Sequence, residues 1–261
     1  MTTLFRLSAF ALFAAAGMSG TAVAAPAIAL VGDKTLVMFD TETLAASASM
    51  EVSGVDRLLG IDVRPADGML YGVGVDGAVV TIDAASGEVT ARSMLSETLP
   101  DGVSASVDFN PAADRLRLVG SDGTNLRANV DDGAVTVDGA LNFDPADANM
   151  GGTSSVVAVA YTNSYGKPEK TAMYDIDTNL GLLQQTTPND GILATRGALG
   201  VDASETYAFD IASTADLTNT AYLVAGSTIY TVNLETGATT AGAELTGVDG
   251  AVRDIAILPA M

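Results

Sequence analysis

The sequence predicts an all-β fold, a five-bladed β-propeller whose ring closes when the C-terminal strand joins the N-terminal blade. Three observations predict it: a strand-and-turn phrase that occurs five times, two units that match at a constant offset of 46 residues, and chain ends that complement each other. A period in the forties with four short strands per period is typical of propeller blades.

The repeated phrase is apolar, any residue, apolar, then Asp or Asn, and a Gly usually follows four residues later. The alternation predicts a strand, and the Asp or Asn with its Gly predicts a tight turn into the next strand. In the first copy Leu44 stands at the position of that Gly. The five copies end at Asp40, Asp83, Asn129, Asp177 and Asn233.

A second phrase, apolar-Asp-apolar, precedes the first and predicts the inner strand of each blade. The remaining unit has Val159-Ala160-Tyr161 and lacks the Asp. The four aspartates of this phrase are Asp62, Asp108, Asp210 and Asp254. In the second unit the pattern predicts strands at Leu59–Val63, Met69–Val73, Ala78–Ile82 and Glu88–Ala91.

The two ends of the chain predict how the ring closes. The N-terminal part offers three strands with no inner strand before them, and Ala251–Leu258 is a single strand of the missing type. If it completes the first blade, no inner edge is left unpaired. The expected blades are 28–51 with 251–258, 58–92, 105–137, 156–185 and 207–241.

Residues 1–24 are expected to be a signal peptide, and residues 25–261 a single propeller domain. Arg6 supplies the positive region, an apolar stretch follows, and Ala22-Val23-Ala24 resembles a cleavage site. The apolar run is shorter than the roughly 18 residues expected of a membrane span. We therefore expect cleavage after Ala24 and a periplasmic or secreted protein.

The composition excludes several classes of function. The chain carries 32 acidic and 12 basic residues, a net charge of −20 that falls to near −21 when Arg6 leaves with the signal peptide. Such a surface repels nucleic acid and anionic membranes, and it suits divalent cations, cationic ligands or solubility alone. The absence of His and Cys excludes His-assisted nucleophiles and thiol chemistry, which leaves carboxylates and oxygen-ligand metals.

The recurring inner-strand aspartates have two interpretations. They are hydrogen-bond acceptors that build the blades, or they form an acidic ring at the channel mouth that holds a cation. Paired carboxylates also perform glycoside hydrolysis, so a carboxylate-based glycoside hydrolase or a lactone- or sugar-acting enzyme is the alternative to a binding protein.

Two long connections, Asp138–Ser155 and Gln185–Glu205, are predicted to lie on one face of the ring, which makes that face the candidate binding surface. Oxygen donors in these loops suit Ca²⁺. The candidate metal ligands are Asp144, Asp147 and Asn149. The alternative is that these residues make Asx-turns beside Pro and Gly.

Three of the few basic residues, Arg115, Arg117 and Arg127, cluster in the third unit, although the matching positions of the second unit carry no arginine. They are predicted to bind a carboxylate or phosphate group. The alternative is an ion-pair network between blades with neighbouring aspartates such as Asp114 and Asp131.

A series of motifs runs along the expected mature chain: Asp108-Phe109-Asn110-Pro111, Asp114-Arg115-Leu116-Arg117, Asn125-Leu126-Arg127, Asp147-Ala148-Asn149, Tyr161-Thr162-Asn163, Tyr174-Asp175-Ile176-Asp177, Pro188-Asn189-Asp190-Gly191 and Gly197-Ala198-Leu199-Gly200-Val201-Asp202. The series resembles that of an exported bacterial domain-of-unknown-function family. The resemblance implies a propeller-like fold and carries over no catalytic residue. It directs attention to the third and fourth units, where the motifs gather.

Together these observations predict an exported, non-catalytic binding or scaffold propeller. Its expected partner is a small molecule, a cation or an extracellular protein, and Ca²⁺ is the one cofactor considered. The candidate ligand-binding residues are Asp114, Arg115, Arg117, Asn125, Arg127, Asn163, Asn189 and Asp190.

Overall fold

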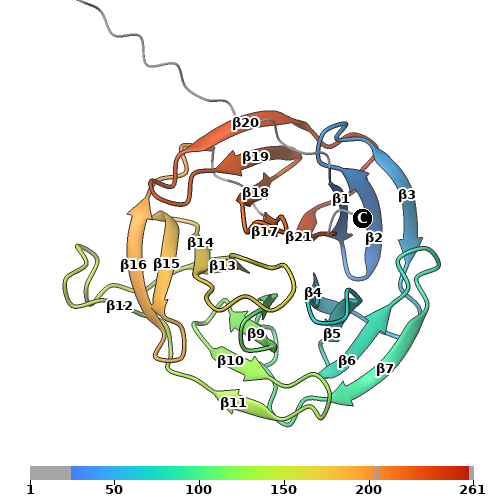
Figure 1. Cartoon of the computed structure of the whole chain (residues 1–261), viewed down its shortest axis with the longest axis horizontal. Coiled ribbons are helices and arrows are strands. Elements are labelled where there is room, and N and C mark those ends of the chain that lie inside the picture. Colours follow the sequence, from blue (N-terminus) through green and yellow to red (C-terminus); the bar gives the residue numbers. More distant parts are fainter. Residues whose placement is uncertain (1–24, 203, 205, 259–261) are drawn as a thin grey trace, which may run out of the picture.

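A computed structural model describes residues 25–202, 204 and 206–258, so the expected signal peptide lies outside the described residues. In the described part, the strands form five sheets arranged in a ring (Figure 1). The fold is a five-bladed β-propeller, which confirms the predicted class. Within the same ranges, no helix has the length and apolar character needed to cross a membrane.

The four strands of each blade are named A to D, from the central axis outward. Blade 1 contains β21 (Val252–Ile257), β1 (Pro26–Val31), β2 (Thr35–Asp40) and β3 (Ala46–Glu51). Blade 2 contains β4 (Leu58–Val63), β5 (Leu70–Gly74), β6 (Ala78–Ile82) and β7 (Val89–Met94). Blade 3 contains β8 (Ala105–Asn110), β9 (Arg115–Gly120), β10 (Asn125–Ala128) and β11 (Val135–Val137). Blade 4 contains β13 (Val156–Tyr161), β14 (Met173–Asp177), β15 (Gly181–Thr187) and β16 (Ile192–Gly197), with the short β12 (Asn142–Phe143) at its outer edge. Blade 5 contains β17 (Tyr207–Ser213), β18 (Asn219–Ala225), β19 (Thr228–Val232) and β20 (Thr239–Glu244).

The ring closes as the chain ends predict. Strand β21 pairs antiparallel with β1, with Ala27 opposite Ile257 and Leu30 opposite Asp254. The last described strand thus becomes the inner strand of the first blade (Figure 1). This pairing leaves the inner edge of β1 without free backbone groups.

The outer hairpin turns of blades 1, 2, 3 and 5 form where the repeated phrase predicts them. The carboxylate of Asp83, for example, accepts hydrogen bonds from the backbone of Ala85 and Ser86, and the N–H of Gly87 donates to the Asp83 carbonyl. Gly87 has a φ of 74°, a left-handed conformation that favours glycine. Leu44 adopts the same conformation in blade 1, with a φ of 54°.

The predicted extent of blade 4 is wrong. The phrase that ends at Asp177 belongs to the second strand, β14, and not to the third, so the blade continues through β15 and β16 instead of ending at residue 185. Residues 188–191 therefore form the turn between β15 and β16. The predicted long connection 185–205 contains a strand, and only 198–206 joins blade 4 to blade 5.

This difference changes which residues share a face of the ring. Antiparallel strands place the A-to-B and C-to-D turns at one end of the blades, here called the A–B face, and the B-to-C turns and blade-to-blade joins at the other. Asn189 and Asp190 lie in a C-to-D turn and so belong to the A–B face. The join 138–155 starts at the opposite end of blade 3, but Gly139 and Asn142 donate to the carbonyls of Asn189 and Gly191 in this turn, and β12 then pairs parallel with β16 along the edge of blade 4.

The hydrophobic core consists of five clusters, one at each boundary between adjacent blades. Between blades 2 and 3, for example, Tyr71 meets Phe109 edge to face, with ring centroids 5.2 Å apart. A propeller is stabilised by such face-to-face packing of neighbouring sheets. Each blade therefore depends on both of its neighbours.

Gly133 lies at a boundary where two blades approach most closely. It has a φ of 75°, and an added Cβ would overlap the backbone carbonyl of Met94 in blade 2, coming within 2.7 Å of its carbon. Gly133→Ala is expected to destabilise the protein by about 3–5 kcal/mol, because a left-handed Ala costs about 1–2 kcal/mol and the overlap adds to it. Gly123→Ala is the matched control, since Gly123 has a φ of 87° but nothing within 4 Å of an added Cβ. Urea denaturation of both variants checks this, and equal midpoints would contradict the close approach.

Candidate functional site

The inner-strand aspartates connect neighbouring blades. Each carboxylate accepts a hydrogen bond from a backbone N–H of the inner strand of the next blade. The pairs are Asp254 with Ile61 at 2.9 Å, Asp62 with Phe109 at 2.7 Å, Asp108 with Tyr161 at 3.0 Å and Asp210 with Ile257 at 2.6 Å. These bonds agree with the interpretation of the aspartates as acceptors that build the propeller.

Blade 4 carries no such aspartate, and other residues connect it to blade 5. The backbone of Asn163 donates to the side-chain oxygen of Asn219 at 2.8 Å, and the Asn219 amide donates back to Asn163 at 2.9 Å. Ser164 adds a bond from its backbone to the Ser213 hydroxyl at 2.8 Å. These bonds hold the long loop 162–172, between β13 and β14, against the A–B face near the axis (Figure 1).

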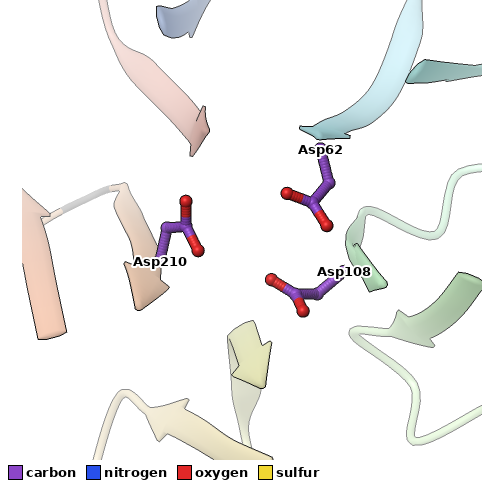
Figure 2. A group of neighbouring side chains, drawn as sticks. All are labelled: Asp62, Asp108 and Asp210. Carbon is purple, nitrogen blue, oxygen red and sulfur yellow. The ribbon is translucent and has the colours of Figure 1, made fainter. Parts of the chain in front are cut away.

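Three of the aspartates converge at the axis. Figure 2 shows the carboxyl groups of Asp62, Asp108 and Asp210 pointing toward one another, and one oxygen from each lies within 4.8 Å of the others. All three side chains are buried. Burial raises the pKa of Asp210 to about 6, and burial together with the charge of neighbouring aspartates raises the pKa of Asp62 and of Asp108 well above the ordinary value.

A cavity of about 400 Å³ lies over this group on the A–B face. Asp62 and Asp210 are at its boundary, and its walls come from the A-to-B turns of blades 2, 4 and 5 and from both described chain ends. We call it the axial cavity. The apolar wall consists of Val63, Pro65, Ile211, Ile257 and Leu258, and hydroxyl groups come from Ser164, Ser213, Thr214, Thr218, Thr220, Tyr165 and Tyr222. No basic residue is among the described residues that line it.

The predicted ligand-binding residues fall into separate groups, and the largest group surrounds Arg117. The Arg117 side chain is 1% exposed and donates to Tyr161 Oη at 3.2 Å, Asn125 Oδ1 at 2.9 Å and Asn189 Oδ1 at 3.0 Å. It also forms a 2.5 Å ion pair with Asp138. Arg127 reaches the same carboxylate through two 3.0 Å bonds. The cluster joins blades 3 and 4, and Asp190 lies beside it at a second cavity.

Asp114 and Arg115 belong to a different boundary. Arg64 of blade 2 binds the Asp114 carboxylate with two bonds of 2.8 and 2.7 Å and also pairs with Asp131. Among the described residues, Arg115 donates only to backbone oxygens. An ion network between blades 2 and 3 therefore exists, but its arginines are Arg64 and Arg92, which also pairs with Asp131 at 3.5 Å. The sequence reasoning missed both because they lie outside the third unit.

The three candidate calcium ligands lie beside β16. Asp144 and Asp147 each accept a bond from the backbone two residues later, and Asp147 also accepts the N–H of Thr195 at 2.6 Å. Asn149 donates to the Thr195 hydroxyl at 2.9 Å. These are Asx-turns that attach the blade 3 to blade 4 connection to the outer strand. Calcium binding by Asp144, Asp147 and Asn149 stays a prediction.

Comparisons with known proteins bear on the family and the fold. A family model described as Domain of unknown function (DUF4394) matches residues 35–256. A structural genomics protein of unknown function from Bacteroides thetaiotaomicron VPI-5482 is similar in structure, with a TM-score of 0.54, 16% identity, and coverage of 92% of this chain and 68% of that one. A search of curated proteins by sequence found no match.

Two further solved structures match with lower scores. A protein of unknown function from Bacteroides caccae has a TM-score of 0.45 and 11% identity, over 87% of this chain and 75% of the other. The dihydro-heme d1 dehydrogenase NirN in complex with DHE has a TM-score of 0.40 and 16% identity, over 85% of this chain and 44% of that protein. At these scores neither similarity supports a conclusion about fold or ligand.

Proposed function

Since this chain belongs to the domain-of-unknown-function family DUF4394, whose description names no activity, we propose a function from its own site: an exported, non-catalytic propeller that binds a small organic cation in the axial cavity. The observation that supports this is a mainly apolar cavity that ends on two buried carboxylates, Asp62 and Asp210, with no basic residue among its described lining. A ligand with an ammonium group and an apolar body matches both parts.

The charges of the site favour a cation over a neutral or anionic ligand. The carboxylates of Asp62 and Asp210 are buried and lie close to that of Asp108, so their ionised forms repel one another. A bound cation relieves this repulsion in a site shielded from water, where charges interact more strongly. The strongly acidic chain also raises the local concentration of cations around it.

The cavity itself favours an organic cation over a metal ion. Calcium takes six to eight oxygen ligands, whereas each oxygen of Asp62 and Asp210 already accepts one backbone N–H and keeps a single lone pair. These remaining lone pairs are too few to coordinate calcium but can accept the N–H groups of an ammonium ion. The apolar wall formed by Val63, Ile211 and Ile257 offers no ligand for a metal but can cover a hydrocarbon chain. Tyr222, also at the cavity, supplies an aromatic ring for cation–π contact.

The same geometry bears on the enzymatic alternative. In retaining glycosidases the two carboxyl groups are about 5–5.5 Å apart and each has a free oxygen that meets the substrate. The aspartates here have oxygens within 4.8 Å of one another, but each oxygen of Asp62 and Asp210 accepts a backbone N–H, one from the next residue and one from the inner strand of the neighbouring blade. We therefore favour binding over hydrolysis.

The test uses three five-carbon probes of similar size: n-pentylammonium, 1-pentanol and pentanoate. At pH 7.5 only pentylammonium is expected to bind, as measured by calorimetry on the purified protein. The intact mass of the same preparation checks whether the mature protein starts at Ala25, as expected. Asp210→Asn removes the charge and also one of the two oxygens that accept backbone N–H groups, so circular dichroism first checks that the variant is folded. The folded variant should bind pentylammonium at least about tenfold more weakly, which is about 1.4 kcal/mol. Binding should also weaken below about pH 6, where Asp210 takes up a proton.

Two outcomes would contradict this function. Equal binding of pentylammonium and pentanol would mean that the carboxylates play no part. A rise in melting temperature with Ca²⁺ that Asp210→Asn abolishes, without any response to pentylammonium, would assign the site to a metal ion. Asp83→Asn is the matched control, because Asp83 is an exposed turn aspartate far from the cavity and should leave binding unchanged.

A further inference from the structure

A second cavity lies on the A–B face, between blades 3 and 4. Its volume is about 400 Å³, and it lies between the ends of β8, β13 and β15 and the start of β14. Loop 162–172 separates it from the axial cavity, since residues 164–166 line the axial cavity and Thr171 lines this one. We call it the lateral cavity.

The lateral cavity differs from the axial cavity in its chemistry. Amide and hydroxyl groups dominate its lining, and Asp190 is the one charged residue among the described residues that line it. These groups can both donate and accept hydrogen bonds. Such groups come from Asn110, Tyr161, Gln185, Thr187 and Asn189.

Gln185 is the side chain that points to a ligand in this cavity. Its side chain is 1% exposed, its amide donates to Asp175 Oδ1 at 3.3 Å, and its Oε1 has no donor among the described residues. Asp175, which is fully buried, likewise has an Oδ2 without a partner in the described part of the chain. A buried polar atom left unsatisfied costs about 1–3 kcal/mol. A proton on Asp175, whose pKa burial raises to about 8, can be shared between Asp175 Oδ2 and Gln185 Oε1. An amide oxygen has two lone pairs, so Gln185 Oε1 on the cavity wall still has room to accept a hydrogen bond from a ligand.

The wall around Gln185 is held rigidly from behind by Arg117. The guanidinium donates to the hydroxyl oxygen of Tyr161 and to the amide oxygen of Asn189. Because these oxygens are occupied, the hydroxyl hydrogen of Tyr161 and the amide hydrogens of Asn189 are the groups left to meet a ligand. A wall fixed by buried bonds loses little entropy when a ligand binds.

We propose that the lateral cavity binds an uncharged polyhydroxyl molecule, a polyol or monosaccharide, whose hydroxyl groups donate to Gln185 and accept from Tyr161 and Asn189. The mixture of donors and acceptors matches hydroxyl groups, which are both. The ring of Tyr161 is buried, so the wall offers hydrogen bonds and no stacking face. The site is independent of the axial cavity and takes a different class of ligand.

The experiment measures binding of D-glucose, D-mannitol and xylitol to the purified protein by saturation-transfer-difference NMR and calorimetry. At least one probe is expected to bind with a dissociation constant in the millimolar range or tighter. Gln185→Met, a substitution of similar length, should weaken that binding at least about tenfold. It should leave pentylammonium binding unchanged, whereas Asp210→Asn should leave sugar binding unchanged.

A crystal structure with the bound probe tests the same proposal without a variant. Density for the sugar or polyol within hydrogen-bond distance of Gln185 Oε1 is the expected result. The proposal is overturned if none of the three probes binds at 20–50 mM, or if Gln185→Met binds them as the wild type does. It is also overturned if soaked crystals show only an ordered water between Gln185 and Asp175.

Discussion

Replacing Arg117 with Ala is expected to lower the free energy of unfolding by about 3–5 kcal/mol, because it empties the space of a large buried side chain and leaves several buried acceptors without their donor, although Arg127 still pairs with Asp138. The Asp138 carboxylate, 5% exposed, would lose its 2.5 Å contact with Arg117. Asn125 and Asn189 would lose the donor that joins them. Urea denaturation followed by circular dichroism measures the change, since the chain has no Trp.

Arg115→Ala is the matched control for this prediction. Arg115 precedes Arg117 by two residues on the same strand and, in the described part of the chain, donates only to backbone oxygens. Its loss is expected to change stability by about 0.5 kcal/mol or less. If Arg117→Ala were as stable as Arg115→Ala but failed to bind ligands, Arg117 would have the ligand-binding role that the sequence suggests.

Stability is expected to fall as the pH rises from about 4 to 8. Burial raises the pKa of Asp175 from 3.8 to about 8 and that of Asp210 to about 6. Between the unfolded and folded values, the folded protein binds more protons than the unfolded chain, so each such group lowers the unfolding free energy by up to about 1.4 kcal/mol per pH unit. Stability from these groups is therefore fully present below about pH 4.

The opposite trend operates at lower pH. The Arg64 guanidinium holds the pKa of Asp114 and of Asp131 below the ordinary value. These carboxylates contribute stability that is lost as the pH falls through their folded pKa. The two trends together predict a maximum of stability near pH 4–5, below the neutral range in which many proteins are most stable.

Asp175→Asn isolates the larger part of the first trend. The pKa of Asp175 is raised by burial and by the charge of Asp177, and is lowered by Gln185 and Arg117. An Asn of the same shape does not ionise, so the decline in melting temperature between pH 6 and 8 should become shallower. Asp83→Asn, which changes an exposed carboxylate, should leave that decline as in the wild type. Parallel declines in all three proteins would mean that Asp175 is ionised at neutral pH.

Much of the ring was predictable because each turn and each inner strand is specified by residues that lie close together in the sequence. Gly87 and Gly133 mark matching turns, and Asp62 and Asp108 mark matching inner strands, so two blades align without a gap. The orphan strand at the C-terminus indicated closure, which the pairing of β21 with β1 confirms.

Blade 4 was misread because strand alternation does not record a strand's place within its sheet. The phrase at Tyr174–Asp177 has the same pattern as the third strand of other blades, yet β14 is second. The sequence of β16, from Ile192 to Gly197, lacks the repeated phrase altogether. Its turn, with Asn189 and Asp190, was therefore read as part of a long loop on the wrong face.

The sites depend on contacts that pattern cannot supply. The recurrence of Asp62 and Asp210 was visible, but the depth of their burial follows from five inner strands meeting at one axis. The isolation of Gln185 and Asp175 results from the packing of β14 against β15, and neither residue stands out in the sequence.

The pairing of β21 with β1 also sets the order in which the protein can be completed. The inner neighbour of the first described strand is the last described one, so the ring can close only after both strands have been made and brought together. Contacts between segments far apart in the sequence form slowly. A chain that lacks β21 would therefore lack the inner strand of a blade, and the edge of β1 would be exposed at the axis.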